Sequence, residues 1–485
     1  MNNTALKLLD LSEVKLLVGG RWENAYSGET YELKNPSNGQ KIADIPYGGH
    51  QETANAINEA EKVLEGWSKL TAYERAEYLL ILRDLLFENE KELAELMSLE
   101  MGKAYKESLG EIKYAASFLT WYAEEGKRIY GETIPASAQN KRLFVIKQPV
   151  GVVAAITPWN FPLAMMTRKL GPALAAGCTS IVKPASQSPL TALAFGKLVE
   201  QSGIPRGVVS ILTGNTGEIS NEIFENPIVK KVSFTGSTSV GKALVKSSAS
   251  QLKKLSLELG GHAPFLIFED ADLEKAAEGA LASKFRNAGQ TCVCANRIYV
   301  HENVKDKFAE IFTEKVEKLV VGDSLQEQTD IGPLVNEAGL NKVVEHVEDA
   351  VKKGAKVLCG GKRKGASGYY YYPTVVDEIK DEMLIMNEET FGPVAPISTF
   401  SDTDEVIKRA NNTEYGLAAY LYTNDIKQAV YVSERINFGV VGLNDAMPGT
   451  AQAPFGGMKE SGYGREGGKE GIQEYLEEKY ISLDL

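Results

Sequence analysis

Short apolar runs alternate with segments of helical length from residue 150 onward. The runs cover residues 150–156, 180–182, 208–212, 232–234 and 265–268. This rhythm predicts a parallel α/β sheet whose strands are connected by crossover helices. Ligands of such sheets bind beyond the carboxyl ends of the strands, so we expect functional residues directly after these runs.

The part of the chain before residue 150 follows two other patterns. Residues 52–127 predict helices, and Thr71-Ala72-Tyr73-Glu74 has the form of a capping box ahead of an amphipathic helix. We interpret these helices as scaffold. Residues 131–149 are polar and β-prone without a helical period, which predicts a hairpin that leaves the body of its domain. Because an exposed hairpin edge favours pairing with another strand, we expect a homo-oligomer, either a dimer or a tetramer.

Composition narrows the class of protein. A chain of 485 residues is too long for one ordinary hydrophobic core, so about two or three domains are expected. Hydrophobic residues at 43% and charged residues at 24% are ordinary globular values and argue against disorder. The formal net charge of −12, without any block of lysine and arginine, argues against binding to nucleic acid.

The N-terminal segment mixes Lys7, Asp10, Glu13 and Lys15 among its leucines, so we expect neither a signal peptide nor a membrane anchor. The sequence contains no stretch of about 18 apolar residues. Four cysteines in so long a chain suit a reducing compartment, and the four histidines are isolated. We therefore expect a cytoplasmic protein without membrane contact and without a protein-built metal site.

The segment from Arg286 to Arg297 carries the strongest candidate for a reactive group. It follows an acidic, alanine-rich helical run over residues 272–285 and precedes the strand-like residues 298–300. A tight turn is therefore expected between these elements. A turn held by rigid neighbours can present a side chain to solvent and to backbone donors. Cys292 is the candidate nucleophile. A thiol with an ordinary pKa of about 8.5 is mostly protonated at neutral pH, and we expect loop donors and nearby cations to lower this pKa.

Two motifs around this cysteine resemble the active-site pair of the aldehyde dehydrogenase superfamily, namely Glu258-Leu259-Gly260-Gly261 and Gly289-Gln290-Thr291-Cys292. The resemblance extends from Asn35-Pro36 to Pro454-Phe455-Gly456-Gly457 and Ser461-Gly462. It implies an α/β fold with a Rossmann-type cofactor domain, an α/β catalytic domain and a small β oligomerisation hairpin. The expected bounds are 1–130 and 150–264 for the NAD(P)-binding domain, 265–445 for the catalytic domain, 131–149 and 468–485 for the oligomerisation segments, and 446–467 for a connecting loop region.

The resemblance also implies a reaction, the oxidation of an aldehyde to a carboxylic acid. Cys292 attacks the aldehyde carbon, and the Asn160 amide with the Cys292 backbone N–H holds the oxyanion of the thiohemiacetal. Hydride passes to a nicotinamide, and water activated by Glu258 releases the acid from the thioester. The apolar neighbours of Glu258 are expected to raise its pKa. Taken alone, Asn160 fits an ordinary turn and Glu258 a solvated strand equally well.

Several motifs point to a nicotinamide cofactor. A lysine in the position of Lys183 binds ribose hydroxyls in the family, and the residue at Ser186 helps to decide the cofactor. Because Ser186 is small and neutral, it leaves room for a 2′-phosphate, so we favour NADP over NAD. The turn after Phe234 offers helix N-terminal donors to a pyrophosphate. The further cofactor-binding residues implied by the resemblance are Trp159, Gly236, Ser237, Leu259, Glu389 and Phe391.

Two other glycine motifs fit nucleotide binding less well. Gly236 to Lys242 nearly forms the P-loop of an NTPase, but Ala243 cannot ligate magnesium as the required Ser or Thr would. Residues 462–467 satisfy G-x-G-x-x-G without a preceding strand, and Gly468 is expected to keep the next helix from starting at once. We interpret that segment as a structural loop.

Two arginines narrow the substrate. The contexts of Arg168 and Arg286 resemble the succinate-semialdehyde dehydrogenase branch, in which such arginines bind the distal carboxylate of the substrate. Ordinary ion pairs are the alternative for both. Gly449 stands where that branch has a serine, so either Thr450 substitutes or the contact is missing. Succinate semialdehyde is therefore the favoured substrate, and another small polar or carboxylated aldehyde, or a catalytically silent structural protein of the same fold, is the alternative.

Cys294 lies two residues after the candidate nucleophile. The resemblance implies a reversible disulfide between Cys292 and Cys294 under oxidation, and a passive packed thiol is an equally good interpretation.

Overall fold

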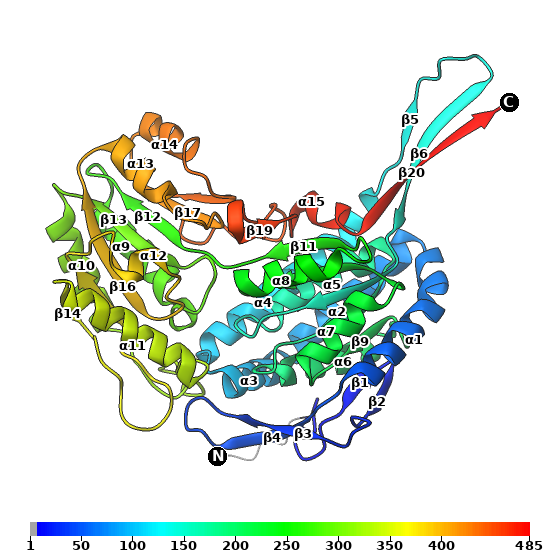
Figure 1. Ribbon diagram of the computed structural model, residues 1–485, viewed down its shortest axis with the longest axis horizontal. Helices are drawn as coiled ribbons and strands as arrows, with labels where there is room; N and C mark the ends of the chain where they lie inside the picture. The colour runs from blue at the N-terminus through cyan, green and yellow to red at the C-terminus, as the bar shows by residue number, and fades with distance from the viewer. Residues whose placement is uncertain (1–6) are drawn as a thin grey trace.

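Two large sheets form the body of the chain in the computed structural model, which describes residues 7–485 (Figure 1). The first sheet has eight strands in the order β19-β11-β10-β7-β8-β9-β1-β2. The strands are β1 Leu16–Val18, β2 Arg21–Glu23, β7 Val152–Ile156, β8 Thr179–Lys183, β9 Val209–Ile211, β10 Val229–Thr235, β11 Lys254–Glu258 and β19 Gly462–Tyr463.

The five central strands of this sheet, β11-β10-β7-β8-β9, pair in parallel. Numbered along the chain, they stand in the order 5-4-1-2-3, which is the strand order of a Rossmann-type sheet. From β7 the chain extends the sheet on one side through β8 and β9, and then crosses over to add β10 and β11 on the other side. The ligand-binding crevice is expected at this change of direction, beside the carboxyl end of β7. Each of the four predicted runs between residues 150 and 234 overlaps one of these strands.

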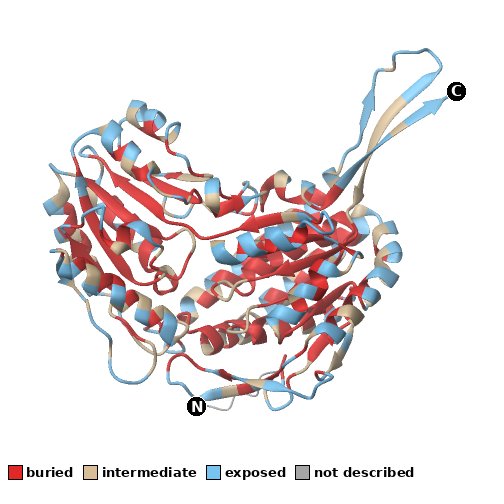
Figure 2. Cartoon of the chain, viewed as in Figure 1, coloured by how far each residue is buried: buried red, intermediate tan, exposed pale blue. Residues whose placement is uncertain are grey.

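The second sheet has seven strands in the order β14-β15-β16-β13-β12-β17-β18, all parallel except β14. Its strands are β12 Ala263–Ile267, β13 Ala295–His301, β14 Lys356–Cys359, β15 Thr374–Asp377, β16 Val394–Phe400, β17 Ala418–Tyr422 and β18 Val440–Leu443. The central strands of both sheets are buried on both faces, as Figure 2 shows in red. This burial explains why they read as continuous apolar runs.

Helices cover the sheets. The α-helices are α1 His50–Lys69, α2 Ala72–Glu88, α3 Glu90–Met101, α4 Tyr105–Glu125, α5 Ala164–Ala176, α6 Pro189–Gln201, α7 Thr216–Glu225, α8 Thr238–Ser248, α9 Leu273–Phe285, α10 Lys305–Glu317, α11 Glu337–Lys352, α12 Leu384–Asn387, α13 Thr403–Asn411, α14 Ile426–Ser433 and α15 Gly468–Gln473. Short 3₁₀ turns are η1 Gly126–Arg128, η2 Arg286–Gly289 and η3 Lys459–Ser461. The capping box predicted at Thr71 is confirmed, since Thr71 and Glu74 bond each other's backbone N–H.

A three-stranded antiparallel sheet leaves the body, as predicted from the polar pattern before residue 150 (Figure 1). It contains β5 Glu132–Ile134, β6 Lys141–Pro149 and β20 Leu476–Asp484. The C-terminal strand β20 pairs with β6 along its whole length, from Leu476 opposite Pro149 to Asp484 opposite Lys141. A separate hairpin consists of β3 Thr30–Lys34 and β4 Lys41–Pro46.

The region before α15 differs from the prediction. Gly468 was expected to delay the helix, but α15 begins at this residue. Its N–H donates to the carbonyl of Ala451, and both Gly467 and Gly468 have positive φ angles of 72° and 57°. The two glycines thus turn the chain sharply into the helix. The expected connecting loop region also supplies β19 to the edge of the first sheet, and the predicted domain bounds remain predictions.

Among residues 7–485, no helix has both the length and the apolar character needed to cross a membrane.

Candidate active site

A cavity of about 510 Å³ lies where the carboxyl ends of β7, β10 and β11 face the loops that precede β13 and β16. This is the sheet edge at which the sequence predicts ligand binding. Its wall includes most of the predicted site residues, namely Trp159, Asn160, Arg168, Gly236, Ser237, Leu259, Arg286, Cys292, Glu389 and Phe391.

Five predicted site residues lie outside the cavity wall. Glu258 is buried at the end of β11, and Cys294 is fully buried after the turn of Cys292. Lys183 ends β8, with Ser186 three residues further along the chain. Thr450 is exposed, while its neighbour Gly449 lines the cavity. The structure therefore gives no support to Thr450 as a replacement for the missing serine.

A tight left-handed turn carries Cys292, as the sequence predicts. Asn287, Ala288 and Gly289 have φ angles of 51°, 54° and 74°. Asparagine and glycine tolerate this region, whereas Ala288 is strained there, and such strain is often found at functional sites. The turn leaves Cys292 half-buried in the cavity wall.

The acidity of this thiol differs from the prediction. Burial raises the pKa of Cys292 to about 12, and the nearby Glu258 carboxylate raises it further, while Arg168 and Arg286 act in the opposite direction. The expected lowering of this pKa by loop donors and cations is therefore wrong. The physical reason is that desolvation of a thiolate outweighs two arginines that are themselves shared with carboxylates or aromatic rings.

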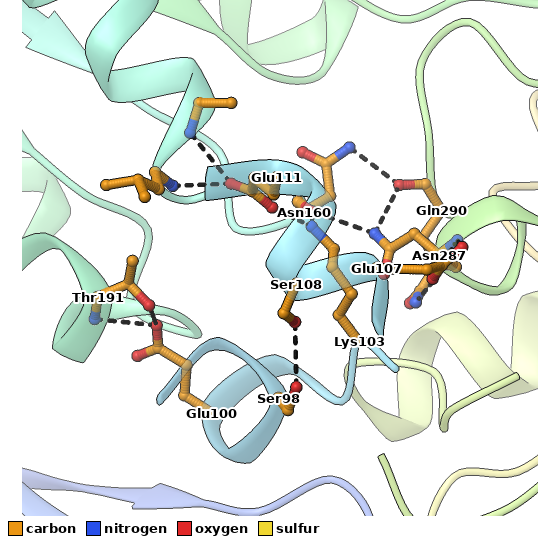
Figure 3. A network of polar contacts seen from close by, with 12 residues as sticks. Ser98, Glu100, Lys103, Glu107, Ser108, Glu111, Asn160, Thr191, Asn287 and Gln290 are labelled. Carbon is orange, nitrogen blue, oxygen red and sulfur yellow. Dashed lines mark hydrogen bonds and ion pairs between the residues drawn. The ribbon is translucent and has the colours of Figure 1, made fainter. Parts of the chain in front are cut away.

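Asn160 is held by hydrogen bonds from both sides (Figure 3). Its side-chain Nδ2 donates to the backbone carbonyl of Gln290 at 2.9 Å, and its backbone carbonyl accepts from Asn287 Nδ2 at 3.1 Å. The loop after β7 and the turn of Cys292 are thus bonded directly to each other. One Nδ2 proton remains to point at an oxyanion on the cavity side.

Three charged residues, one in the loop before α4 and two on α4, fix these two loops (Figure 3). Lys103 Nζ donates to the Asn160 carbonyl at 2.8 Å and forms a buried ion pair with Glu111. Glu111 accepts from the backbone N–H of Leu163 and Ala164 at 2.9 and 3.0 Å, at the start of α5.

The third charge, Glu107, accepts the backbone N–H of Asn287 with both carboxylate oxygens at 3.0 Å. All three side chains line the cavity. The interpretation of residues 52–127 as scaffold alone is therefore incomplete. The signal in the sequence is the spacing of four residues between Glu107 and Glu111, which places both on one face of α4, while Lys103 lies in the loop just before this helix.

We expect Glu111→Gln to destabilise the protein strongly. The change leaves the Lys103 ammonium buried without its anion, and breaking a buried pair in this way typically costs about 3–5 kcal/mol. Thermal unfolding of the variant should show a clearly lower midpoint, and Lys103→Met combined with Glu111→Leu should recover part of the loss. A midpoint equal to that of the wild type would show that this pair does not hold the loops.

Glu258 lies behind the cavity wall in contact with Arg168. Burial raises the pKa of Glu258 to about 7, and the Arg168 guanidinium partly opposes the shift. The predicted raised pKa is confirmed. Arg168 Nη2 lies 3.3 Å from Glu258 Oε2, and Arg168 Nε lies 3.0 Å from Glu466 Oε2. Glu466 also forms an ion pair with Lys169.

Arg286 has a different environment from Arg168. Its guanidinium lies over the Phe161 ring, 5.2 Å from the centroid, and Nη1 contacts Met447 Sδ at 3.4 Å. Within residues 7–485 no carboxylate forms a salt bridge with it. The cavity wall therefore presents a partly buried cation without an anionic partner.

The residues predicted to hold a nicotinamide cofactor fit that role. Trp159 and Phe391 meet edge to face in the cavity wall with ring centroids 5.5 Å apart. The Glu389 carboxylate accepts from Gly261 N–H at 3.1 Å, and burial raises the pKa of Glu389 to about 7. Helix α8 begins at the turn of Gly236 and Ser237, so its N-terminal dipole faces the same crevice.

Lys183 fits an anionic ligand on the outer side of the same sheet edge. Its amine is buried, and its one hydrogen bond to the part of the chain that the structure describes goes to the carbonyl of Pro184, at 3.0 Å. Burial lowers the pKa of Lys183 to about 8, so a phosphate beside it would stabilise the charged amine. Ser186 offers no charge to oppose such a phosphate.

Cys294 packs with its sulfur 3.5 Å from the Lys284 carbonyl, and burial raises its pKa. All four cysteines are free thiols. The disulfide with Cys292 therefore remains a prediction.

Comparisons with known proteins agree with this geometry. The model of the family described as Aldehyde dehydrogenase family matches residues 22–481. An Escherichia coli (strain K12) relative named succinate-semialdehyde dehydrogenase, with NADP(+) in its name, is 52% identical over 482 residues, which cover 99% of this chain and 100% of the relative.

A glutarate-semialdehyde dehydrogenase of Pseudomonas aeruginosa is 51% identical, with 99% of both chains covered. The crystal structure of succinate-semialdehyde dehydrogenase from Burkholderia pseudomallei superposes with a TM-score of 0.97 at 48% identity, and covers 99% of this chain and 100% of its own. The predicted resemblance and fold class are confirmed, and the chain belongs to the aldehyde dehydrogenase family.

Proposed function

We propose that the protein oxidises a carboxylated semialdehyde to the diacid, with succinate semialdehyde as the favoured substrate and NADP as the favoured cofactor. The observation that carries the proposal is Arg286, an unpaired cation in the wall of the cavity that also contains Cys292. A guanidinium binds a carboxylate through two parallel hydrogen bonds, which would orient the aldehyde end toward the thiol. The NADP(+) succinate-semialdehyde dehydrogenase relative supports the same substrate and cofactor.

The reaction begins when the Cys292 thiolate attacks the aldehyde carbon and forms a thiohemiacetal. The free Asn160 Nδ2 proton and the backbone N–H of Cys292 stabilise the oxyanion. Because the pKa of Cys292 is raised to about 12 by burial, the thiol requires a proton acceptor, and Glu258 with its pKa near 7 is the nearby base. After Glu258 has passed this proton on to solvent, its carboxylate activates the water that hydrolyses the acyl-enzyme.

A bound nicotinamide would accept the hydride that leaves the thiohemiacetal carbon, and so convert it into a thioester. Trp159, Phe391 and Glu389 would hold the nicotinamide end of the cofactor at the cavity. Lys183 and Ser186 would bind the adenosine ribose, where the lysine would neutralise a 2′-phosphate.

Glutarate semialdehyde, which is one carbon longer, is a second candidate substrate. The P. aeruginosa relative of that name is about as similar as the E. coli one. The distal arginine contact would be the same, so the aldehyde's length has to be resolved by kinetics.

The test is a panel of aldehydes with and without a distal carboxylate, assayed with NADP and with NAD. Succinate or glutarate semialdehyde should exceed butanal in kcat/KM, and Arg286→Met should remove about 10- to 150-fold of this advantage, the loss of one charged hydrogen-bonded contact. Butanal itself should be little affected by Arg286→Met. Equal values for butanal and succinate semialdehyde in the wild type would contradict the substrate, and at least tenfold preference for NAD would contradict the cofactor.

The extended sheet supports a homo-oligomer. The outer strands β5 and β20 have no partner on their outer edges within residues 7–485. Exposed apolar side chains lie along them, including Ile134, Tyr480 and Leu483. Pairing of such an edge with a second copy would cover it, and we expect a dimer or tetramer in sedimentation experiments. The expected cytoplasmic location stays a prediction.

A further inference from the structure

Arg168 contacts two carboxylates of the protein and the cavity at the same time. Its guanidinium donates a hydrogen bond to Glu258 through Nη2 at 3.3 Å and forms an ion pair with Glu466 through Nε at 3.0 Å. It also lies over the Phe455 ring, 4.3 Å from the centroid. Only 2% of the Arg168 side chain is exposed, and that part belongs to the cavity wall.

Glu258 has fewer partners than Arg168. Among the described residues, Arg168 is the only hydrogen-bond partner of the Glu258 carboxylate, because the second oxygen, Oε1, is buried and has none. Glu466, in contrast, also bonds Lys169 and Ser233. Glu466 is therefore held in place by Lys169 and Ser233, and its ion pair with Arg168 is the shorter of the two, whereas the Glu258 carboxylate has no second anchor among the described residues and can be exchanged.

A carboxylate that enters the cavity would compete with Glu258 for the same guanidinium. The Nη atoms face Glu258 and Met165, and the Nη1 contact with the Met165 sulfur is only a weak hydrogen bond. An incoming carboxylate can thus approach the Nη edge while Nε stays on Glu466. We propose that Arg168 holds Glu258 in an ion pair when no distal carboxylate is bound, and that the carboxylate of the substrate takes the place of Glu258 on the Arg168 guanidinium. This inference rests on the carboxylated substrate of the proposed function.

The consequence is that the correct substrate frees its own general base. An uncharged aldehyde leaves Glu258 paired with Arg168 behind the cavity wall, since Glu258 is not among the residues that line the cavity. A carboxylated aldehyde displaces it toward the cavity. Arg168 is therefore a positioning residue for the base, in addition to any contact with substrate.

The charges around Glu258 determine the sign of the expected pH effect. The groups that act on it are Arg168 and Lys169 from α5, Glu466 and Arg465 from the loop before α15, and Cys292 and Tyr114 across the cavity. Arg168 lowers the pKa of Glu258, so withdrawal of its charge raises that pKa. The hydrolysis of the acyl-enzyme needs deprotonated Glu258, so its rate should then rise at higher pH than before.

The test compares two acyl-enzymes of the wild-type protein, one formed from succinate semialdehyde and one from butanal. Each is generated in a single turnover with NADP, and the acyl group on Cys292 is followed by rapid quenching and mass spectrometry over a range of pH. The hydrolysis rate of each acyl-enzyme should fall toward low pH, and we call this part of its pH profile the acid limb. We expect the acid limb for the succinyl enzyme to lie about one pH unit or more above that for the butyryl enzyme. Coincident limbs would overturn the inference without the use of any variant.

Variants of the two arginines provide the matched control. In Arg168→Gln the two limbs should coincide near the higher position, and Arg168→Lys, which keeps the charge, should restore part of the separation. Arg286→Gln should keep the full separation, since Arg286 does not contact Glu258. A separation that persists in Arg168→Gln would overturn the inference.

The same data distinguish this inference from the proposed function. If the proposed function fails, succinate semialdehyde and butanal will have equal kcat/KM values in the wild type. If only the inference fails, the carboxylate will still be preferred in kcat/KM, and the two hydrolysis limbs will nevertheless coincide.

Discussion

Cys292→Ala is expected to lose aldehyde oxidation by at least about 10⁴-fold, since removal of a nucleophile from a catalytic unit has effects of this order. Alanine cannot form the thiohemiacetal, and water has no second route to the acid from the aldehyde at this site. The measurement is steady-state reduction of NADP with succinate semialdehyde. The half-buried side chain contributes little to packing, so the variant should unfold at nearly the wild-type temperature.

Cys294→Ala is the matched control, because it removes a thiol two residues away that does not line the cavity. It should retain most of the activity. Substantial turnover in Cys292→Ala, or a comparable loss in Cys294→Ala, would contradict the assignment of the nucleophile. The redox prediction is tested on the wild-type enzyme. Oxidised wild-type enzyme that dithiothreitol fails to restore would argue against a Cys292–Cys294 disulfide.

Glu258→Gln is expected to lower kcat by about 10²–10⁴-fold, the usual contribution of a general base. The pKa of Glu258 is raised to about 7 by burial, so the wild-type carboxylate is protonated below that pH and cannot accept a proton. The wild-type rate should therefore fall as the pH drops through about 7, and the variant should lack this limb. Steady-state rates over pH 5–9, roughly the range around that pKa, provide the measurement.

The outcome that would contradict this role is a Glu258→Gln variant that keeps both a wild-type rate and a wild-type acid limb. Glu389→Gln separates the two buried carboxylates whose pKa values are both raised to about 7. As a proposed ribose ligand, Glu389 should affect the KM for cofactor, and the acid limb of acyl-enzyme hydrolysis should remain.

Much of the fold follows from local signals in the sequence. The apolar runs of β7 and β8 are recognisable because both faces of these strands are buried, and the cap of α2 is recognisable because Thr71 and Glu74 stand three residues apart. The start of α15 was not predictable in this way. It depends on the bond from Gly468 N–H to the Ala451 carbonyl and on two positive φ angles, which no local pattern specifies.

The site residues also fall into those that a local sequence motif predicts and those that only the packing identifies. Cys292, Asn160 and Glu389 follow recognisable motifs, and the cavity brings them together. Glu107 and Glu111 have a helical spacing that fits a solvated face equally well, and Lys103 lies in the loop before α4, so only the packing of this region against two loops identifies the three residues.

Electrostatics also required the three-dimensional structure. The pKa of the Cys292 thiol depends on burial and on the distance to Glu258, and neither is contained in the motif that predicts a reactive cysteine. The contact between Arg168 and Glu258 joins residues that are 90 positions apart. The sequence therefore favoured Arg168 as a residue that binds the substrate, with an ion pair as the alternative, and it did not identify Glu258 as the partner.

The central claim is that a thiol in this cavity forms a covalent bond to a carboxylated aldehyde and carries it through oxidation. The most direct measurement is peptide mass spectrometry of Glu258→Gln quenched in acid during turnover of succinate semialdehyde with NADP. Slow hydrolysis should leave one succinyl group on the peptide that contains Cys292. Reduced cofactor produced while the Cys292 peptide remains unmodified, or a succinyl group found only on another residue, would contradict the account.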